Sequence, residues 1–221
     1  MEMKRHNFEF LLASLLLLLI ASPIVYDLGG THSAMITDLG FSVVIILAVW
    51  SLHGSRFWFT VGIVMAVAGL LFDILHVVQG WSGFVLLAIL CNLTFLTLTI
   101  VIAFRQLVRA HDIDMNTIMG AVCIYLLIGV IWSLLFAITE IAIPGSFEGI
   151  GDLADVAAGK GQALLYYSFV TLTTLGYGDI LPVSATARGL AYTEAILGQF
   201  YIAVLVAGLV SILASKTKKS D

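Results

Sequence analysis

The residues whose types and spacing suggest chemistry lie in one segment, Gln162–Pro182, which reads QALLYYSFVTLTTLGYGDILP. Its first half is apolar, and its second half carries Gly176 and Gly178, which can adopt positive φ at little cost. As a helix, Ala163–Thr173 would be about 17 Å long, roughly half of a bilayer core of about 30 Å. In a bilayer the segment must therefore enter and return on the same side. Non-helical backbone at that depth must be buried by protein or line water, so the segment is a pore element or a binding site.

The composition of the chain places that segment in a membrane. Of 221 residues, 61% are hydrophobic and 11% are charged, whereas a soluble domain has about 45–50% apolar and about 25% charged residues. The mean hydropathy is +1.09. The stretches Trp81–Phe104 and Thr117–Thr139 hold no charged residue, and each can supply a span of about 20 residues. An integral membrane protein is therefore expected.

Six spans are expected, at about residues 8–26, 36–52, 57–78, 81–104, 117–139 and 188–214. The first has a second interpretation as a secretory signal peptide, because Lys4 and Arg5 precede its apolar run. A retained helix is favoured, since the run can span and Pro23 stands where a cleavage site would need small residues. An N-terminus inside the cell leaves only Lys160 and Arg188 of the ten basic residues outside. The expectation is a multi-pass cell membrane protein with both termini in the cytoplasm.

The other polar residues carry weaker signals. Acidic residues such as Glu140, Glu148 and Asp179 gather in the expected external segments, which indicates either loop solvation or a negative vestibule that concentrates cations. Cys91 and Cys123 lie in apolar runs and are expected to be buried thiols, without a disulfide or metal site. The net charge of −4 gives no indication of nucleic acid binding.

The residues Thr173–Asp179, TTLGYGD, resemble the signature of the potassium channel superfamily, and Pro182 follows them as it does in that family. The resemblance implies a selectivity filter in which backbone carbonyls and a threonine hydroxyl replace the hydration shell of K⁺. The implied filter residues are Thr174, Leu175, Gly176, Tyr177 and Gly178, with K⁺ at the first four. Leu175 replaces the commoner valine, a departure that bears on fine selectivity. No cofactor other than the permeant K⁺ is expected.

The same resemblance implies roles for the residues around the filter. Tyr166 and Tyr167 are positioned like the paired aromatic residues that form a cuff around the filter, and Asp179 belongs to the same support. Tyr177 would point away from the pore axis and brace the strand from behind. Some bacterial relatives carry a glutamate at position 170 that pairs with the filter aspartate, and Val170 removes that pair here.

In the last span, Glu194–Tyr201, EAILGQFY, resembles the inner helix of the prokaryotic two-helix pore module. Gly198 falls at the hinge glycine of that module, and close helix packing is the other interpretation. Ile202 and Val206 follow at helical spacing and would line a cavity, with lipid-facing or packing roles as alternatives. Glu194 is ionisable and intramembrane, which makes a function the first hypothesis, and a hydrogen-bonded structural role is favoured.

The resemblance divides the chain into a four-helix N-terminal region, residues 1–112, and a pore domain, residues 113–221. The N-terminal region has the layout of a voltage sensor without its ladder of arginines, because Arg105 and Arg109 stand only at the cytoplasmic end of the fourth span. Weak intrinsic voltage dependence is therefore expected. Since one filter strand cannot surround an ion, the chain is expected to assemble with three identical subunits into a closed tetramer.

The expected fold is thus an all-α membrane protein with six transmembrane helices, a re-entrant pore helix and a filter loop, in a tetrameric pore. The expected function is passive conduction of K⁺ across a lipid bilayer. The alternatives are a non-selective cation channel, against which Tyr177 argues, and a non-conducting modulatory membrane subunit. An enzyme is not expected, because Ser168 has no histidine or lysine within its segment to activate it.

Overall fold

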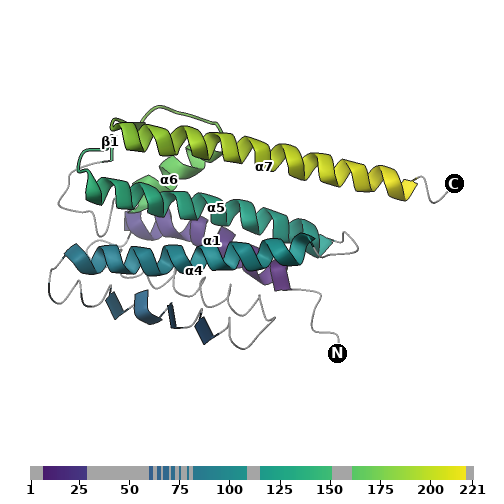
Figure 1. The fold of residues 1–221 in the computed structure, drawn as a ribbon, viewed down its shortest axis with the longest axis horizontal. Helices are drawn as coiled ribbons and strands as arrows, with labels where there is room; N and C mark the ends of the chain where they lie inside the picture. The colour runs from purple at the N-terminus through teal and green to yellow at the C-terminus, as the bar shows by residue number, and fades with distance from the viewer. Residues whose placement is uncertain are drawn as a thin grey trace.

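The computed structural model describes residues 7–28, 82–108, 115–150 and 161–217, together with residues 60–61, 64–65, 67–69, 71–72, 75 and 79. These residues form a bundle of long helices with one short helix, α6, inserted among them (Figure 1). The described residues of the third predicted span are helical, and the second predicted span, 36–52, lies outside the described residues. The proposed boundary at residue 112 also lies outside them.

The long helices correspond to the first, fourth, fifth and sixth predicted spans. They are α1 (Asn7–Leu28), α4 (Ser82–Val108), α5 (Met115–Ala142) and α7 (Ala185–Thr217). By length and hydropathy, α4 and α5 could each cross a membrane, and α1 contributes a shorter apolar stretch, Phe8–Ile24. The expectation of a helical membrane protein is therefore supported, while six spans stay a prediction.

Local sequence explains where α5 and α7 meet the loops. After α5 ends at Ala142, the chain continues into Pro144 and Gly145, and Gly145 adopts a φ of 81°. Such a left-handed conformation favours glycine and stops a helix. At the start of α7, the Ser184 hydroxyl accepts a hydrogen bond from the Ala187 N–H at 3.1 Å. Ser184 thus satisfies one of the N–H groups that a helix leaves unpaired at its first turn.

Helix α5 lies at the centre of the bundle and contacts α1, α4, α6 and α7. Its first half packs on α1 and α4 through buried aliphatic side chains such as Leu11, Leu96 and Leu127. Its second half places Trp132 and Phe136 in a separate aromatic cluster near α6. The predicted N-terminal region and the predicted pore domain are therefore in direct contact through α5.

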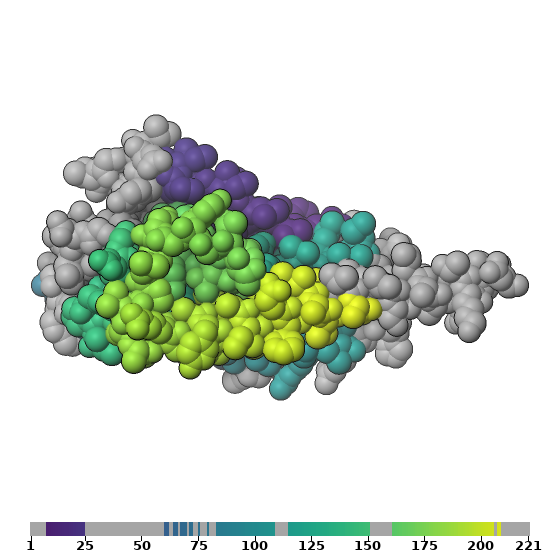
Figure 2. Space-filling view, turned by 90° about the horizontal axis from the view of Figure 1, so that it is seen from above, coloured from purple at the N-terminus to yellow at the C-terminus, as the bar shows by residue number. Residues whose placement is uncertain are grey.

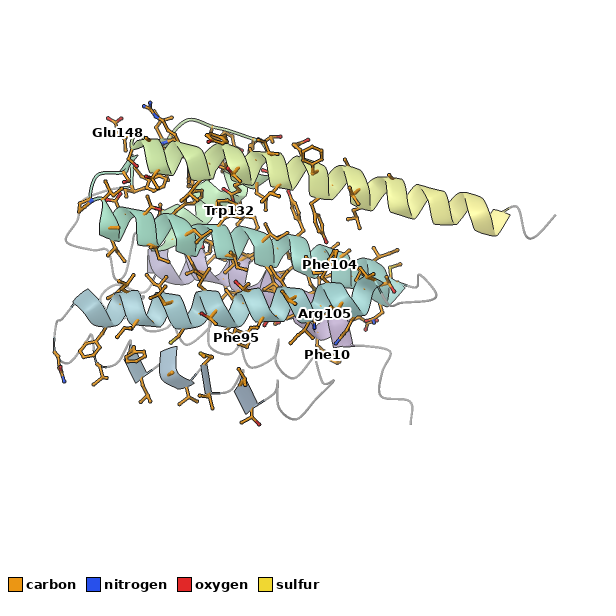
Figure 3. The ribbon with its side chains drawn as sticks, in the orientation of Figure 1. Phe10, Phe95, Phe104, Arg105, Trp132 and Glu148 are labelled. Atoms are coloured by element: carbon orange, nitrogen blue, oxygen red, sulfur yellow. The ribbon has the colours of Figure 1, made fainter. Side chains whose placement is uncertain are left out.

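The two ends of the bundle differ in character. Figure 3 shows Phe10, Phe104 and Arg105 toward one end of the bundle and Glu148 at the other. The α7 helix runs toward the Arg105 end and extends beyond its neighbours (Figure 1). The predicted orientation assigns the Arg105 end to the cytoplasm and the Glu148 end to the outside. In that orientation, the short helix α6 would lie in the outer half of the membrane, because it is near the Glu148 end (Figure 1).

Candidate functional site

Helix α6, Gly161–Leu172, has 12 residues and is about 18 Å long, too short to cross a bilayer. The chain reverses directly after it. The Leu175 N–H donates to the Val170 carbonyl at 2.9 Å, and the Thr174 N–H donates to the Thr171 carbonyl at 2.9 Å. This pair of bonds is a Schellman motif, which satisfies carbonyls of the last turn and redirects the chain. The short predicted helix and its return are therefore both present.

The backbone after α6 alternates between two conformations. Thr174, Gly176 and Gly178 have φ values of 59°, 59° and 79°, and the residues between them lie outside the left-handed region. Glycine adopts these values freely, but a β-branched threonine at positive φ is strained. Positive φ at every second residue departs from the backbone of a regular strand, in which φ is negative throughout. Residues 174–178 therefore do not form a regular strand, and their carbonyls need not alternate between two sides.

This segment lies on the surface of the isolated chain. Residues 173–179 are all exposed, and the space-filling view shows the chain that follows α6 on the visible face beside α7 (Figure 2). Leu175 is 55% exposed and Tyr177 is 67% exposed. An apolar leucine and an aromatic ring at these exposures leave a surface that further protein could cover.

The strained Thr174 is held by side-chain contacts. Its hydroxyl donates to the Thr173 carbonyl at 2.7 Å and accepts a hydrogen bond from the Gln199 amide at 3.2 Å. Gln199 lies on α7, one residue after Gly198. The sequence did not single out Gln199 as a site residue, because nothing in the helical pattern shows that position 199 faces Thr174.

The predicted support residues contact the segment or its neighbours. The Tyr166 hydroxyl donates to the Asp179 carboxylate at 2.7 Å and so ties α6 to the end of the segment. This hydrogen bond raises the pKa of Tyr166 to about 12. Tyr167 is buried instead, with its ring centroid 5.0 Å from that of Phe136 and 5.4 Å from that of Phe147. The two tyrosines thus have different surroundings.

The loop that follows α5 supports the far end of the segment. Strand β1, Phe147–Glu148, pairs antiparallel with β2, Leu181–Pro182, with Glu148 opposite Leu181. A Cβ on Gly149 would overlap the Asp179 carbonyl oxygen, so only glycine fits there. The buried Glu140 carboxylate holds the start of this loop by accepting from the N–H groups of Gly145 and Phe147 at 3.1 and 3.2 Å.

The predicted hinge and cavity residues lie on α7. A Cβ on Gly198 would overlap the Leu172 carbonyl oxygen, so close packing against α6 requires glycine there. The interpretation as a packing residue is thus supported, and the hinge stays a prediction. Ile202 is 39% exposed, and the side chain of Val206 lies outside the described residues. Their role as a cavity lining stays a prediction.

The chemistry open to this site is binding of an ion by backbone oxygens. In the described ranges, no group of three or more His, Cys, Asp or Glu side chains gathers in a way that could hold a metal ion. The carbonyls of residues 174–177 and the Thr174 hydroxyl are uncharged oxygen atoms, of the kind that can coordinate a cation that has lost its hydration water.

Comparisons with known proteins bear on the segment from α6 to α7. Residues 161–215 match a family model described as ion channel, and this range begins at the first residue of α6 and ends within α7. The chain is also 33% identical over 70 residues to the two pore potassium channel c of Oryza sativa subsp. japonica. That match covers 32% of this chain and 14% of the length of the relative. No solved structure matches the chain significantly. The segment from α6 to α7 is thus similar to an ion channel, in a chain whose apolar helices point to a membrane.

Proposed function

We propose that this chain is the pore-forming subunit of a potassium-selective channel, with residues 174–178 as its selectivity filter. The observation that carries the proposal is the alternation of left-handed backbone at Thr174, Gly176 and Gly178. A regular strand turns successive carbonyls to opposite sides. In the proposed filter, the alternating backbone would turn them to one side, where they would replace the hydration shell of K⁺.

Four identical subunits would complete the pore. One filter strand presents its carbonyls from one direction only, and closed cyclic symmetry supplies the others. The exposed Leu175 and Tyr177 support this assembly, because neighbouring subunits would cover them. In the tetramer, Tyr177 would brace the filter against a neighbouring chain. The partners are therefore three copies of this chain, the lipid bilayer and K⁺.

The N-terminal region would serve as a scaffold with little sensitivity to voltage. In α4 the basic residue of the last turn is Arg105, and Ser82–Phe104 holds no lysine or arginine. Moving one charge through a potential of 100 mV contributes about 2.3 kcal/mol, and a voltage sensor needs several such charges. We expect a shallow dependence of open probability on voltage in a multi-pass channel of the cell membrane with cytoplasmic termini.

The proposal is tested by the reversal potential of the purified full chain in a planar lipid bilayer, with K⁺ on one side and Na⁺ on the other. A reversal potential close to that of a K⁺-selective membrane is expected. A reversal potential near zero would favour the alternative of a non-selective cation channel. Absence of current from folded, inserted protein would favour the alternative of a non-conducting modulatory subunit.

Two glycine variants separate the filter geometry from general damage. Gly176 has a φ of 59°, and a methyl group added there would meet no atom of its own chain within 4 Å, so within the chain Gly176→Ala disturbs the backbone conformation. The left-handed conformation costs a residue with a Cβ about 1–2 kcal/mol, so we expect altered carbonyl positions and reduced selectivity. Gly161→Ala at the exposed start of α6 is the matched control, since its added methyl group also meets no atom within 4 Å. It should leave the reversal potential unchanged.

A further inference from the structure

A buried glutamate, Glu194, lies where α5, α6 and α7 meet, and the hydrogen bonds around it indicate its protonation state. Ser168 of α6 and Glu194 of α7 are both 0% exposed. The Ser168 Oγ lies 2.7 Å from the Gly129 carbonyl oxygen of α5 and 2.5 Å from the Glu194 Oε1. Both distances fall in the range of an O–H···O hydrogen bond.

Two hydrogen bonds need two hydrogens, and the three groups supply them in only one way. The serine hydroxyl has one hydrogen, and the carbonyl of Gly129 has none. If Ser168 donates to an ionised Glu194, its oxygen faces the Gly129 carbonyl at 2.7 Å without a hydrogen between them. If Glu194 carries a proton, it donates to Ser168, and Ser168 donates to Gly129. Only the second arrangement makes both contacts hydrogen bonds.

The second oxygen of Glu194 leads to the same assignment. The Glu194 Oε2 is buried and accepts no hydrogen bond from any residue that the structure describes. For a carboxylate, that oxygen would carry part of a negative charge in an apolar environment without compensation. For a neutral acid, it is an uncharged carbonyl oxygen, which is far less costly to bury.

Among the residues that the structure describes, the titratable groups that face Glu194 from the helices packed against it supply no cation. Tyr125 of α5 and Tyr167 of α6 are close enough to interact electrostatically with Glu194. Both are phenols, which are uncharged at neutral pH. On α7, the Arg188 side chain is exposed and donates to the Pro182 carbonyl at 3.0 Å.

The same helix faces meet again one turn further along. Ser168 and Leu172 are four residues apart on α6, and Glu194 and Gly198 are four residues apart on α7, so each pair shares a face. Glu194 contacts Ser168, and Gly198 approaches the carbonyl of Leu172, the last residue of α6. The proposed filter, residues 174–178, begins two residues after Leu172, so a change in the Ser168 contact can reach it through the last turn of α6.

We propose that Glu194 is a neutral carboxylic acid that donates a hydrogen bond to Ser168. This hydrogen bond positions α6, and with it the proposed filter, against α5 and α7. The link to the filter rests on the proposed function, and the protonation of Glu194 does not. Since the bond requires the proton, its contribution to stability is present at neutral pH and is lost as the pH rises through the titration of Glu194.

The test uses the purified full chain in detergent or lipid, with Glu194→Gln, Ser168→Ala and the double variant. Glutamine keeps the size of the acid and supplies an N–H donor without a titratable proton. We expect Tm of the unmodified protein to fall as the pH is raised from neutral, and Tm of Glu194→Gln to stay level over the same range. Ser168→Ala should lower Tm at neutral pH by roughly 5 °C, and adding Glu194→Gln to it should change little further, because the two residues act as one unit.

Controls separate this acid from the other titratable groups. Any alkaline loss of Tm that persists in Glu194→Gln arises from other titratable groups, such as tyrosine, cysteine, lysine or the terminal amine. Glu148→Gln removes an exposed glutamate of β1 and should leave the pH profile of Tm unchanged. In infrared difference spectra at neutral pH, the carbonyl stretch of a protonated carboxyl group should be present in the unmodified protein and absent from Glu194→Gln.

The outcomes are distinct. The proposal is overturned if Glu194→Gln lowers Tm at neutral pH as much as Ser168→Ala does, if it leaves the pH dependence unchanged, or if the infrared band is missing. These measurements do not require conduction. A protein that shows them but carries no K⁺ current would retain the protonated Glu194 and lose only the proposed channel function.

Discussion

Two buried glutamates lie near the two ends of the segment between α6 and β2, and their hydrogen-bonding roles differ. Near its β2 end, both oxygens of Glu140 accept hydrogen bonds from backbone N–H groups of Gly145 and of Phe147 in β1. Near its α6 end, Glu194 faces the Ser168 hydroxyl, which also contacts the Gly129 carbonyl. The first site surrounds a carboxyl group with donors, and the second offers it acceptors and a single shared hydrogen.

This difference shows that burial alone does not define what a glutamate does in this protein. The groups around the carboxyl decide whether acceptors or a donor are needed, and the same substitution therefore has different consequences at the two sites. Substitutions at the two ends of the segment test this difference through the folding free energy that each one removes.

The largest loss of folding free energy is expected from Gly149→Ala, near the β2 end of the segment. The added Cβ would overlap the Asp179 carbonyl oxygen, and Gly149 has a φ of 89°. Steric overlap and a left-handed alanine together should cost roughly 3 kcal/mol or more of folding free energy. Thermal unfolding of the purified protein measures this loss.

Gly145→Ala is the matched control, because Gly145 has a φ of 81° and no atom lies near the added methyl group. This variant should lose only about 1–2 kcal/mol of folding free energy. Equal losses would show that the contact with Asp179 is unimportant.

A moderate loss of folding free energy is expected from Glu140→Gln, and a smaller loss from Glu194→Gln. At position 140, the amide NH₂ would face a backbone N–H and leave it unpaired in a buried site, at a cost of about 1–3 kcal/mol. At position 194, the NH₂ group can take over the proposed donor role toward Ser168. Chemical or thermal unfolding of the two variants side by side gives the comparison. A greater loss at position 194 than at position 140 would reverse the assignment of donor and acceptor roles.

The smallest effect on stability is expected from Tyr166→Phe. It removes the exposed hydrogen bond of 2.7 Å to Asp179 and keeps the ring, which should cost at most about 0.5–1.5 kcal/mol. Because Asp179 directly follows the proposed filter, residues 174–178, we expect a change in the duration of channel openings with little change in Tm. Single-channel recording and thermal unfolding measure the two quantities. A large fall in Tm without altered openings would assign Tyr166 to folding rather than to the filter.

The helices were predictable because their signals are local. Long apolar runs predicted the spans that became α4, α5 and α7 within a few residues of their ends, and the short run after Gln162 predicted α6. The Schellman motif was not predicted, because Thr174 is a residue type that disfavours the left-handed conformation it adopts there. Hydrogen bonds with the neighbouring backbone and with Gln199 hold it, and these follow from the fold.

By itself, the sequence determined that the chain is strongly apolar, that a short helix is followed by a glycine-rich return, and which residues resemble a filter. These features depend on hydrophobic runs and on the conformational freedom of glycine, which neighbouring residues in the chain specify. The tertiary structure alone decided the partners of individual side chains. Gln199 reaches Thr174, and Glu194 reaches Ser168, across separations of 25 and 26 residues. Periodicity places a residue on a helix face, but only the packing of α5, α6 and α7 determines which atom that face meets.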